Sequence, residues 1–339
     1  HGSGPYSTPA VADGRLFTLG MTSILSVWDA RSGGLIWRRD YSEEFERNRA
    51  YFGTASSPVV WGDLCFVHFG GTWGEESDRG AMVALDVATG AERWRWEEDA
   101  PAIGATPVLA EIGGHLQLVF KSKENIVGVD PSSGTELWRI PYSVSQGNTI
   151  VTPLLIGDQL VTSDSDKGVH SWMIERGVGD GSVADADART AAGVGPEAEA
   201  EIRADAGSGA EMEGWRARKL WQTRDASTYT SSPVLISGQV VGLSHFRRGQ
   251  LFGMNPSNGQ ALWRGEGRAG EHASFVVWGE DLLVFSEDGS LAVGRVSPDG
   301  FRPLRTYDLG DSMMWAHPAV VGHRIIIKDG SRLAVYSFE

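Results

Sequence analysis

The segment SDSDKG, residues 163–168, contains the two carboxylates whose spacing comes closest to a known metal site. Asp164 and Asp166 stand two residues apart and Gly168 follows, which matches the first half of a calcium-binding loop, D-x-D-x-G. The later ligands of that loop are missing, because a strand-like run begins near His170. We therefore predict no metal site here and expect the two aspartates to be solvated.

Other short segments between apolar runs contain cationic and aromatic side chains. Such residues could together hold an anionic or sugar-like ligand, although single charged loop residues are usually only solvated. With the two aspartates, the members of this candidate binding rim are Trp73, Lys121, Lys123, His245, Arg247, Arg248, Trp315, His317 and Lys328. No catalytic residue is predicted among them.

Motifs for other chemistries are missing. The eight histidines include no H-x-x-x-H pair, and no P-loop, G-x-S-x-G or G-x-G-x-x-G stands between a strand and a helix. No carboxylate pair has a separation that predicts saccharide hydrolysis, so hydrolase or lyase chemistry is the weakest alternative.

Charge and cysteine content exclude further classes. Lys and Arg number 30 against 44 Asp and Glu, and the formal charge of −14 repels nucleic-acid phosphates and anionic lipids. Cys65 is the only cysteine, which excludes an internal disulfide and a thiolate zinc cluster, and its apolar neighbours predict a buried residue. No apolar run reaches the ~20 residues that a membrane span needs.

A repeated motif indicates which elements position the candidate residues. In each complete copy an Asp or Asn precedes a Gly by four residues and a Trp by eight, as in ALDVATGAERW. The motif residues are Asp29, Gly33, Trp37, Asp86, Gly90, Trp94, Asp130, Gly134, Trp138, Trp221, Asn255, Gly259 and Trp263. Asx and Gly predict a turn between two strands. We expect each Trp to pack on the neighbouring repeat while its N–H bonds a backbone carbonyl.

A second marker precedes each copy of the motif. It is an apolar run that follows Pro9, Pro58, Pro107, Pro153, Pro233, Phe275 or Pro318. Repeats of ~40 to 50 residues with four strands each are typical of β-propeller blades. We predict one all-β propeller domain, residues 1–339, with seven recognisable blades, the last lacking its outer strand. In a propeller, an N-terminal strand commonly completes such a blade. A native protein of eight blades is the alternative prediction.

One interval between markers is longer than the others. The excess falls at about residues 177–214, a stretch rich in Ala, Gly, Asp and Glu with few large apolar residues. This composition predicts a disordered insertion.

The two faces of a propeller carry different connections. The motif turns join third to fourth strands on one face. Loops between blades, and between second and third strands, lie on the other face, and the candidate rim residues fall in those loops. We therefore expect the rim residues to share one face at the channel mouth.

The chain resembles the pyrroloquinoline-quinone (PQQ)-repeat propellers of the quinoprotein alcohol dehydrogenase-like superfamily. The motif of that family, A-x-D-x-x-T-G-x-x-x-W, is matched in full by Ala84, Asp86, Thr89, Gly90 and Trp94. The resemblance covers nearly the whole chain outside the insertion and is nearest to exported BamB-like bacterial propellers. It implies a periplasmic or extracellular protein, with a membrane tether through an upstream segment left open.

Two functions follow from the resemblance. The dehydrogenases of the family hold PQQ between a tryptophan and a disulfide of adjacent cysteines, beside calcium, and the single Cys65 removes that disulfide. We therefore expect a non-catalytic, monomeric scaffold without a cofactor, which binds a protein or a small-molecule or saccharide ligand at the loop-rich face. The alternative is a PQQ- and calcium-dependent alcohol or sugar dehydrogenase acting at the channel mouth.

Overall fold

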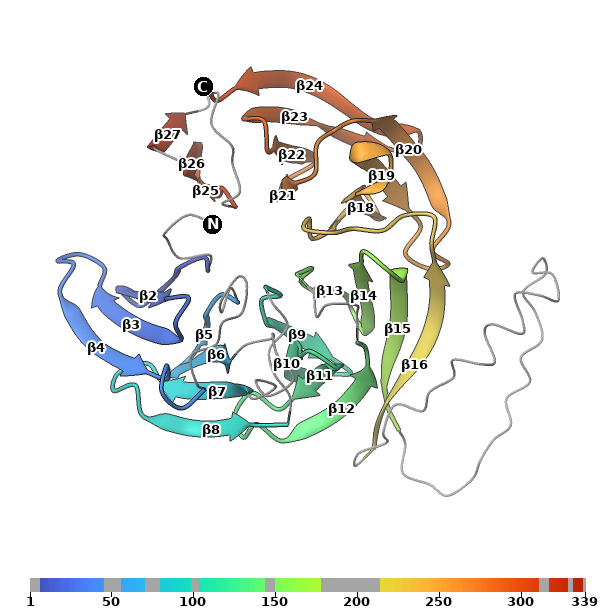
Figure 1. Cartoon of the computed structure of the whole chain (residues 1–339). Helices are drawn as coiled ribbons and strands as arrows, with labels where there is room; N and C mark the ends of the chain where they lie inside the picture. Colours follow the sequence, from blue (N-terminus) through green and yellow to red (C-terminus); the bar gives the residue numbers. More distant parts are fainter. Residues whose placement is uncertain are drawn as a thin grey trace.

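The structure is a computed structural model of the chain. It describes residues 7–45, 56–70, 80–98, 104–143, 150–177, 214–310, 317–328 and 332–337. Within these ranges the strands form seven antiparallel sheets, each made from consecutive strands in chain order. Figure 1 shows the sheets around a common centre, with the first strand of each innermost. The predicted all-β propeller with seven blades is confirmed.

Blades 1 to 4 contain sixteen strands. Blade 1 consists of β1 (Ala10–Ala12), β2 (Arg15–Leu19), β3 (Ile24–Asp29) and β4 (Leu35–Asp40). Blade 2 consists of β5 (Val59–Trp61), β6 (Leu64–Gly70), β7 (Gly80–Asp86) and β8 (Glu92–Trp96). Blade 3 consists of β9 (Val108–Ile112), β10 (His115–Lys121), β11 (Asn125–Val129) and β12 (Glu136–Pro141). Blade 4 consists of β13 (Leu154–Ile156), β14 (Gln159–Asp164), β15 (Gly168–Arg176) and β16 (Trp215–Thr223).

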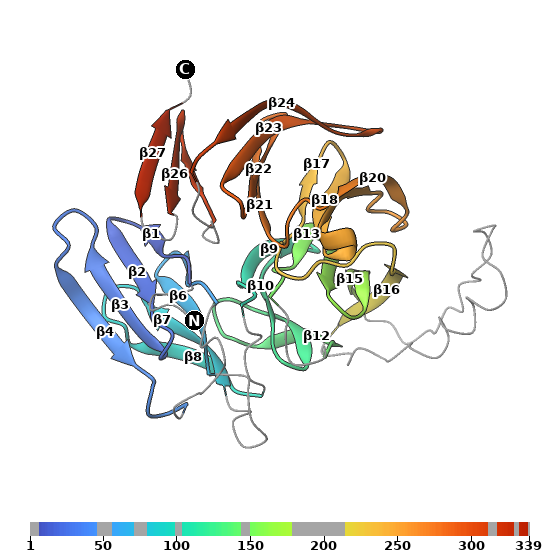
Figure 2. The ribbon, with the colours of Figure 1, turned by 45° about the horizontal axis from the view of Figure 1, so that its top comes forward.

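Blades 5 to 7 complete the ring. Blade 5 consists of β17 (Val234–Ile236), β18 (Gln239–Ser244), the 3₁₀ helix η2 (Phe246–Arg248), β19 (Gln250–Met254) and β20 (Ala261–Gly267). Blade 6 consists of β21 (Ala273–Trp278), β22 (Asp281–Ser286), β23 (Ser290–Ser297) and β24 (Gly300–Asp308). Blade 7 has the three strands β25 (Ala319–Val321), β26 (Arg324–Lys328) and β27 (Leu333–Ser337), as predicted, and neighbours blade 1 in Figure 2. No helix within the described ranges is long and apolar enough to cross a membrane.

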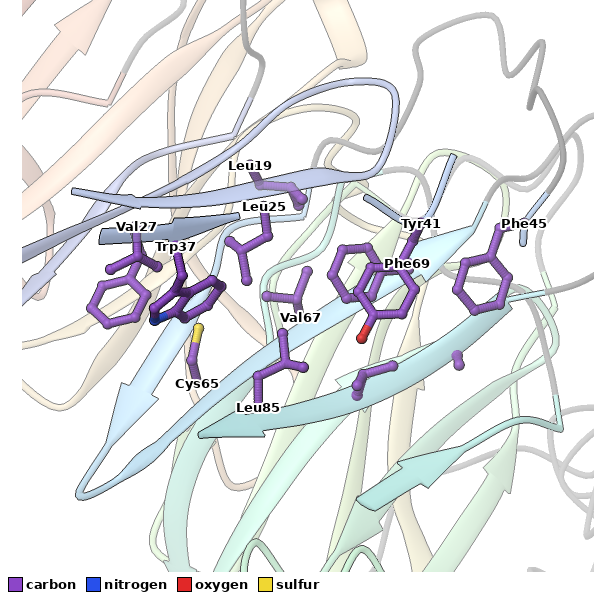
Figure 3. Packing of buried hydrophobic residues seen from close by; sticks show 13 residues of the cluster. Leu19, Leu25, Val27, Trp37, Tyr41, Phe45, Cys65, Val67, Phe69 and Leu85 are labelled. Atoms are coloured by element: carbon purple, nitrogen blue, oxygen red, sulfur yellow. The ribbon is translucent and has the colours of Figure 1, made fainter. Parts of the chain in front are cut away.

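The hydrophobic core lies between neighbouring blades, at contacts that we call seams and number by their two blades. Successive side chains of a strand point to opposite sides of its sheet, so the middle strands bury residues in two seams. All seven residues of β6 are buried. In seam 1–2, Cys65 and Val67 pack in one cluster with Leu25 and Trp37 (Figure 3). Full burial of one such large apolar side chain contributes roughly 1.5–3 kcal/mol.

The connections divide between two faces, which we name the hairpin face and the loop face. The hairpin face carries the turns between first and second and between third and fourth strands, and the loop face carries the other connections. In blade 4 the pairing of β15 with β16 runs to Arg176 opposite Trp215, and the Gly177 N–H donates to the Gly214 carbonyl. The predicted insertion therefore leaves from the hairpin face, and its residues 178–213 lie outside the described residues.

The motif turns lock successive blades together at the hairpin face. In the first of them, Asp29 Oδ1 accepts the N–H groups of Arg31 at 3.1 Å and Ser32 at 2.7 Å. Three of the motif tryptophans donate Nε1–H to a carbonyl in the next blade: Trp37 to Val87 at 3.0 Å, Trp94 to Pro131 at 2.9 Å and Trp221 to Pro256 at 2.8 Å. These bonds tie the outer strand of one blade to the turn of the next.

Trp138 and Trp263 depart from this arrangement. Their Nε1–H groups donate to side chains of their own blades, Gln117 Oε1 at 2.6 Å and Gln239 Oε1 at 2.7 Å. The prediction that the indole N–H bonds a backbone carbonyl is therefore wrong for Trp138 and Trp263. The next blades, 4 and 6, lack the Asx-x-x-x-Gly-x-x-x-Trp sequence at that turn. Gly128 lies opposite Trp138 in the sheet and leaves room for the indole to lie over its own blade.

Candidate functional site

Two of the predicted rim residues are buried in seam 3–4 at the loop face. Lys121 ends β10 and Asp164 ends β14, and each has 1% of its surface exposed. The expectation of solvated loop residues is therefore wrong for this pair. Each residue is the last of the second strand of its blade, and the adjacent blade covers its side chain. Their burial brings a cation and a carboxylate into the same seam.

Asp164 is held by hydrogen bonds to both of its carboxylate oxygens. The Tyr142 hydroxyl, which follows β12, donates to Oδ2. Oδ1 accepts the N–H groups of Asp166 at 2.7 Å and Lys167 at 2.5 Å, which closes the turn between β14 and β15. Lys121 Nζ lies 3.5 Å from the Ser163 carbonyl and 5.2 Å from the centre of the Tyr142 ring.

His170 of β15 completes what we call the polar cluster, made of Lys121, Tyr142, Asp164 and His170. Its ring stacks on Trp172 with the centroids 5.5 Å apart, and its Nε2 lies 3.2 Å from the Lys167 carbonyl. Its Nδ1 and the hydroxyl of Thr162, which pairs with it across the sheet, are buried without a hydrogen-bond partner.

Burial sets the protonation of the polar cluster. It lowers the pKa of Lys121 to about 7, although the nearby charge of Asp164 acts in the opposite direction. Burial, with the charge of Asp164, raises the pKa of Tyr142 well above its usual value. Burial also lowers the pKa of His170 to about 4. At neutral pH the phenol and the imidazole are thus uncharged, and Lys121 loses its charge readily.

The structure shows the surroundings of the residues that were considered for calcium or quinone binding. The described residues contain no group of three His, Cys, Asp or Glu side chains that could hold a metal ion. Both oxygens of Asp164 already accept hydrogen bonds, and the exposed Asp166 accepts one from Ser165 at 3.1 Å. Cys65, the only cysteine, is fully buried in seam 1–2, and burial raises the pKa of its thiol. Trp73 and Trp315 lie outside the described residues.

A chain of hydrogen bonds connects the polar cluster to blade 5. Ser227, in the connection between β16 and β17, donates its hydroxyl to the Asp164 carbonyl at 2.5 Å. The Ser227 carbonyl accepts the His245 N–H at 2.9 Å and also lies 2.9 Å from His245 Nδ1. The Thr228 N–H donates to Ser163 Oγ at 3.0 Å. Blades 3, 4 and 5 are thereby joined at the loop face.

The segment after His245 has an unusual backbone. Arg247 has φ 54° and Arg248 φ 61°, and Arg268 in the connection from β20 to β21 has φ 72°. These are left-handed conformations that non-glycine residues seldom adopt. The two segments bond to each other, because the Arg268 N–H donates to the Arg247 carbonyl at 3.0 Å and the Ala269 N–H to the Gly249 carbonyl at 3.0 Å.

The remaining rim residues belong to other parts of the loop face. Lys123 is half-buried in the turn between β10 and β11. His317 is exposed, with Nε2 3.3 Å from the Phe275 carbonyl of blade 6, and Lys328 is exposed at the end of β26. Arg268 was not among the predicted rim residues, and the sequence signal for it was its place between Gly267 and Gly270 in a connection between two blades.

Comparisons of sequence identify relatives of two kinds. A family profile described as outer membrane protein assembly factor BamB matches residues 1–178. The chain is 27% identical over 219 residues to the quinohemoprotein alcohol dehydrogenase ADH-IIG of Pseudomonas putida, a match that covers 56% of this chain and 29% of that enzyme. It is 22% identical over 225 residues to the outer membrane protein assembly factor BamB of Shewanella oneidensis, which covers 50% of this chain and 54% of that protein. These matches thus span less than a third and about half of the two relatives.

Comparisons of structure show the same fold. BamB from Moraxella catarrhalis superposes with a TM-score of 0.65 at 14% identity, covering 98% of this chain and 85% of that one. The computationally designed Ika8 protein superposes with a TM-score of 0.55 at 12% identity, covering 97% of this chain and 95% of the design.

Proposed function

Because the chain belongs to the family described as outer membrane protein assembly factor BamB, we propose that it is a non-catalytic scaffold that binds a protein partner. The partner contacts the loop face of blades 3, 4 and 5. The observation that carries this proposal is that the buried and the exposed polar groups of this face have different roles. The buried ones bond to one another and join three blades, whereas exposed ones include arginines, which are frequent among the residues that dominate binding at protein interfaces.

The proposed location follows from the same relatives. The BamB of Shewanella oneidensis is named as an outer membrane assembly factor, which supports a periplasmic site of action for this chain. The proposed scaffold acts there as a monomer, and it needs no metal or quinone for binding.

Site-specific photo-crosslinking in the native cells tests the scaffold. A photoreactive residue replaces Glu271 on the loop face or Arg31 on the hairpin face, both exposed. We expect one discrete protein adduct from position 271 and none from position 31, with mass spectrometry identifying the partner. Equal adducts from both faces, or no adduct from either, contradict a specific interface on the loop face.

A second candidate is a quinone-dependent dehydrogenase, favoured only by the identity to the quinohemoprotein enzyme. A ligand that binds the folded state alone raises the midpoint of thermal unfolding. A saturable rise with PQQ and calcium would support this second candidate. An unchanged midpoint at millimolar calcium and excess quinone supports the scaffold.

A further inference from the structure

Three arginines of blade 5 are presented to solvent by a backbone that holds them in a strained conformation. Arg247, Arg248 and Arg268 are exposed and have positive φ angles. Such strain persists only where the surrounding structure enforces it, and it clusters at functional positions. Here the enforcement comes from close contact between two loops, because a Cβ on Gly249 would lie 1.9 Å from the carbonyl oxygen of Gly270.

The charges of these arginines are not neutralised within the described residues. None of the three forms an ion pair or a side-chain hydrogen bond there, whereas Arg216 and Arg218 on the outer strand of blade 4 share Glu175 at 2.7 Å each. The nearby carboxylate of Glu287 accepts the Glu271 N–H at 3.0 Å. The arginines thus form a cationic patch on a chain whose formal charge is −14.

Two aromatic side chains accompany the cations. Phe246 is 38% exposed and directly precedes the arginine pair, and Tyr229 is 40% exposed. Tyr229 belongs to a segment that bonds to His245 through Ser227 and to the Glu271 carbonyl through the Thr230 hydroxyl at 3.3 Å. The segment therefore contacts both arginine-bearing loops. Exposed aromatic and arginine residues in combination are typical of the energetically dominant part of an interface.

We propose that this arginine patch (Tyr229, Phe246, Arg247, Arg248 and Arg268) binds an acidic segment of the protein partner, one that flanks an apolar side chain with carboxylates. The guanidinium groups pair with carboxylates through charge-assisted hydrogen bonds, and the aromatic rings cover the apolar side chain. The net negative charge of the chain disfavours long polyanions such as nucleic acid or an anionic membrane. The inference rests on the proposed scaffold function.

The test measures binding of a labelled synthetic peptide in which glutamates alternate with leucine and phenylalanine. Fluorescence anisotropy compares it with a matched peptide that has glutamine at every glutamate position. The variant R247G/R248G removes two charges and also relieves the left-handed backbone, so its thermal midpoint should not fall. We expect saturable binding of the acidic peptide to the native chain and a loss of about tenfold or more in the variant.

A matched control removes the same charge from the hairpin face. R31S/R302Q changes two exposed arginines there, and Ser132 already occupies the position that corresponds to Arg31 in the motif turn of blade 3. The control should bind the acidic peptide like the native chain. An equal loss in the control shows a general charge effect and overturns the proposal.

Three other outcomes overturn the proposal. These are equal binding of the glutamine peptide, unchanged binding by R247G/R248G, and tighter binding of single-stranded DNA or phosphatidylglycerol vesicles than of the acidic peptide. The crosslinking experiment separates this failure from failure of the scaffold. If R247G/R248G still gives the adduct when the photoreactive residue is at Glu271, the scaffold stands and the two arginines do not hold the partner.

Discussion

Seams 1–2 and 3–4 have different side chains at equivalent strand positions of their loop-face ends. These side chains are mainly apolar in seam 1–2 and polar or charged in seam 3–4. In seam 1–2, Tyr41 stacks on Phe69 with the ring centroids 4.2 Å apart (Figure 3). In seam 3–4, Tyr142 instead donates its hydroxyl to Asp164. The strand registers place Leu19, Tyr41, Val67, Phe69 and Val83 of seam 1–2 at the positions of Lys121, Tyr142, Thr162, Asp164 and His170 of seam 3–4.

The difference teaches that the propeller does not require polar residues at these positions. Seam 1–2 closes with hydrocarbon and aromatic side chains, which gain stability from burial. Seam 3–4 buries a lysine, whose desolvation opposes folding. Lys121 therefore does not stabilise seam 3–4, and the hydrogen bond from Ser227 to the Asp164 carbonyl connects the polar cluster to the loop of blade 5.

The largest effect is expected when the lysine of seam 3–4 is placed in seam 1–2. Leu19→Lys buries an ammonium where no carboxylate is buried, since Asp164 is the only buried acid among the described residues. Burial lowers a lysine pKa by up to 3–5 units, so we expect a loss of about 5 kcal/mol at pH 7. Urea unfolding measures it, with Leu19→Met, which should lose less than about 1.5 kcal/mol, as the control. A loss below about 1 kcal/mol would show that seam 1–2 accepts a charge.

The reverse substitution, Lys121→Leu, should stabilise the chain by about 3 kcal/mol at pH 7, because the desolvation that lowers the Lys121 pKa costs more than the attraction of Lys121 to Asp164 returns. Asp164 keeps three hydrogen bonds without Lys121. The folded pKa of Lys121, about 7, lies below the ordinary value of 10.5. The unfolded chain therefore binds more protons between these values, and this group makes stability rise with pH across that window. Urea unfolding between pH 7 and 9.5 should show the rise in the native chain and its loss in Lys121→Leu. A destabilised variant, or one that keeps the slope, contradicts this account.

The sequence predicts the features that depend on residues close together in the chain. It does not predict those that depend on contacts between different blades or loops. The blades and motif turns were predictable, because Asp29 and Gly33 act within a few residues of each other. The burial of Lys121 and Asp164 was not, because the covering atoms belong to another blade. Arg268 was missed for the same reason, since its conformation depends on a bond to Arg247 in a different loop.

The hairpin-face ends of the two seams differ as well, and Gly128→Ala tests how. Trp37 reaches the next blade and lies opposite Val27, whereas Trp138 lies over Gly128, where a Cβ would be 2.2 Å from its Cε2 atom. We expect a loss of about 2 kcal/mol in urea unfolding, because overpacking displaces the indole. Trp138→Phe in the same chain should recover part of that loss through a smaller ring. A non-additive pair supports the clash, and additive losses would contradict it.

The smallest expected effect is the difference between two alanine substitutions in the motif turns. It separates the cost of displacing a docked tryptophan from the cost of backbone strain. Gly33 and Gly90 occupy the same turn position with φ 73° and 67°, so alanine at either position costs about 1 kcal/mol for the left-handed backbone. At Gly90 the new Cβ would also lie 2.7 Å from Cε3 of Trp37, whereas nothing lies within 4 Å at Gly33. Gly33 has this space because the described part of blade 7, the neighbour of blade 1, has no fourth strand to supply a tryptophan. We therefore expect Gly90→Ala to lose about 1 kcal/mol more than Gly33→Ala in parallel urea unfolding curves. Equal losses would mean that Trp37 yields without cost, and that its bond to Val87 does little to hold blades 1 and 2 together.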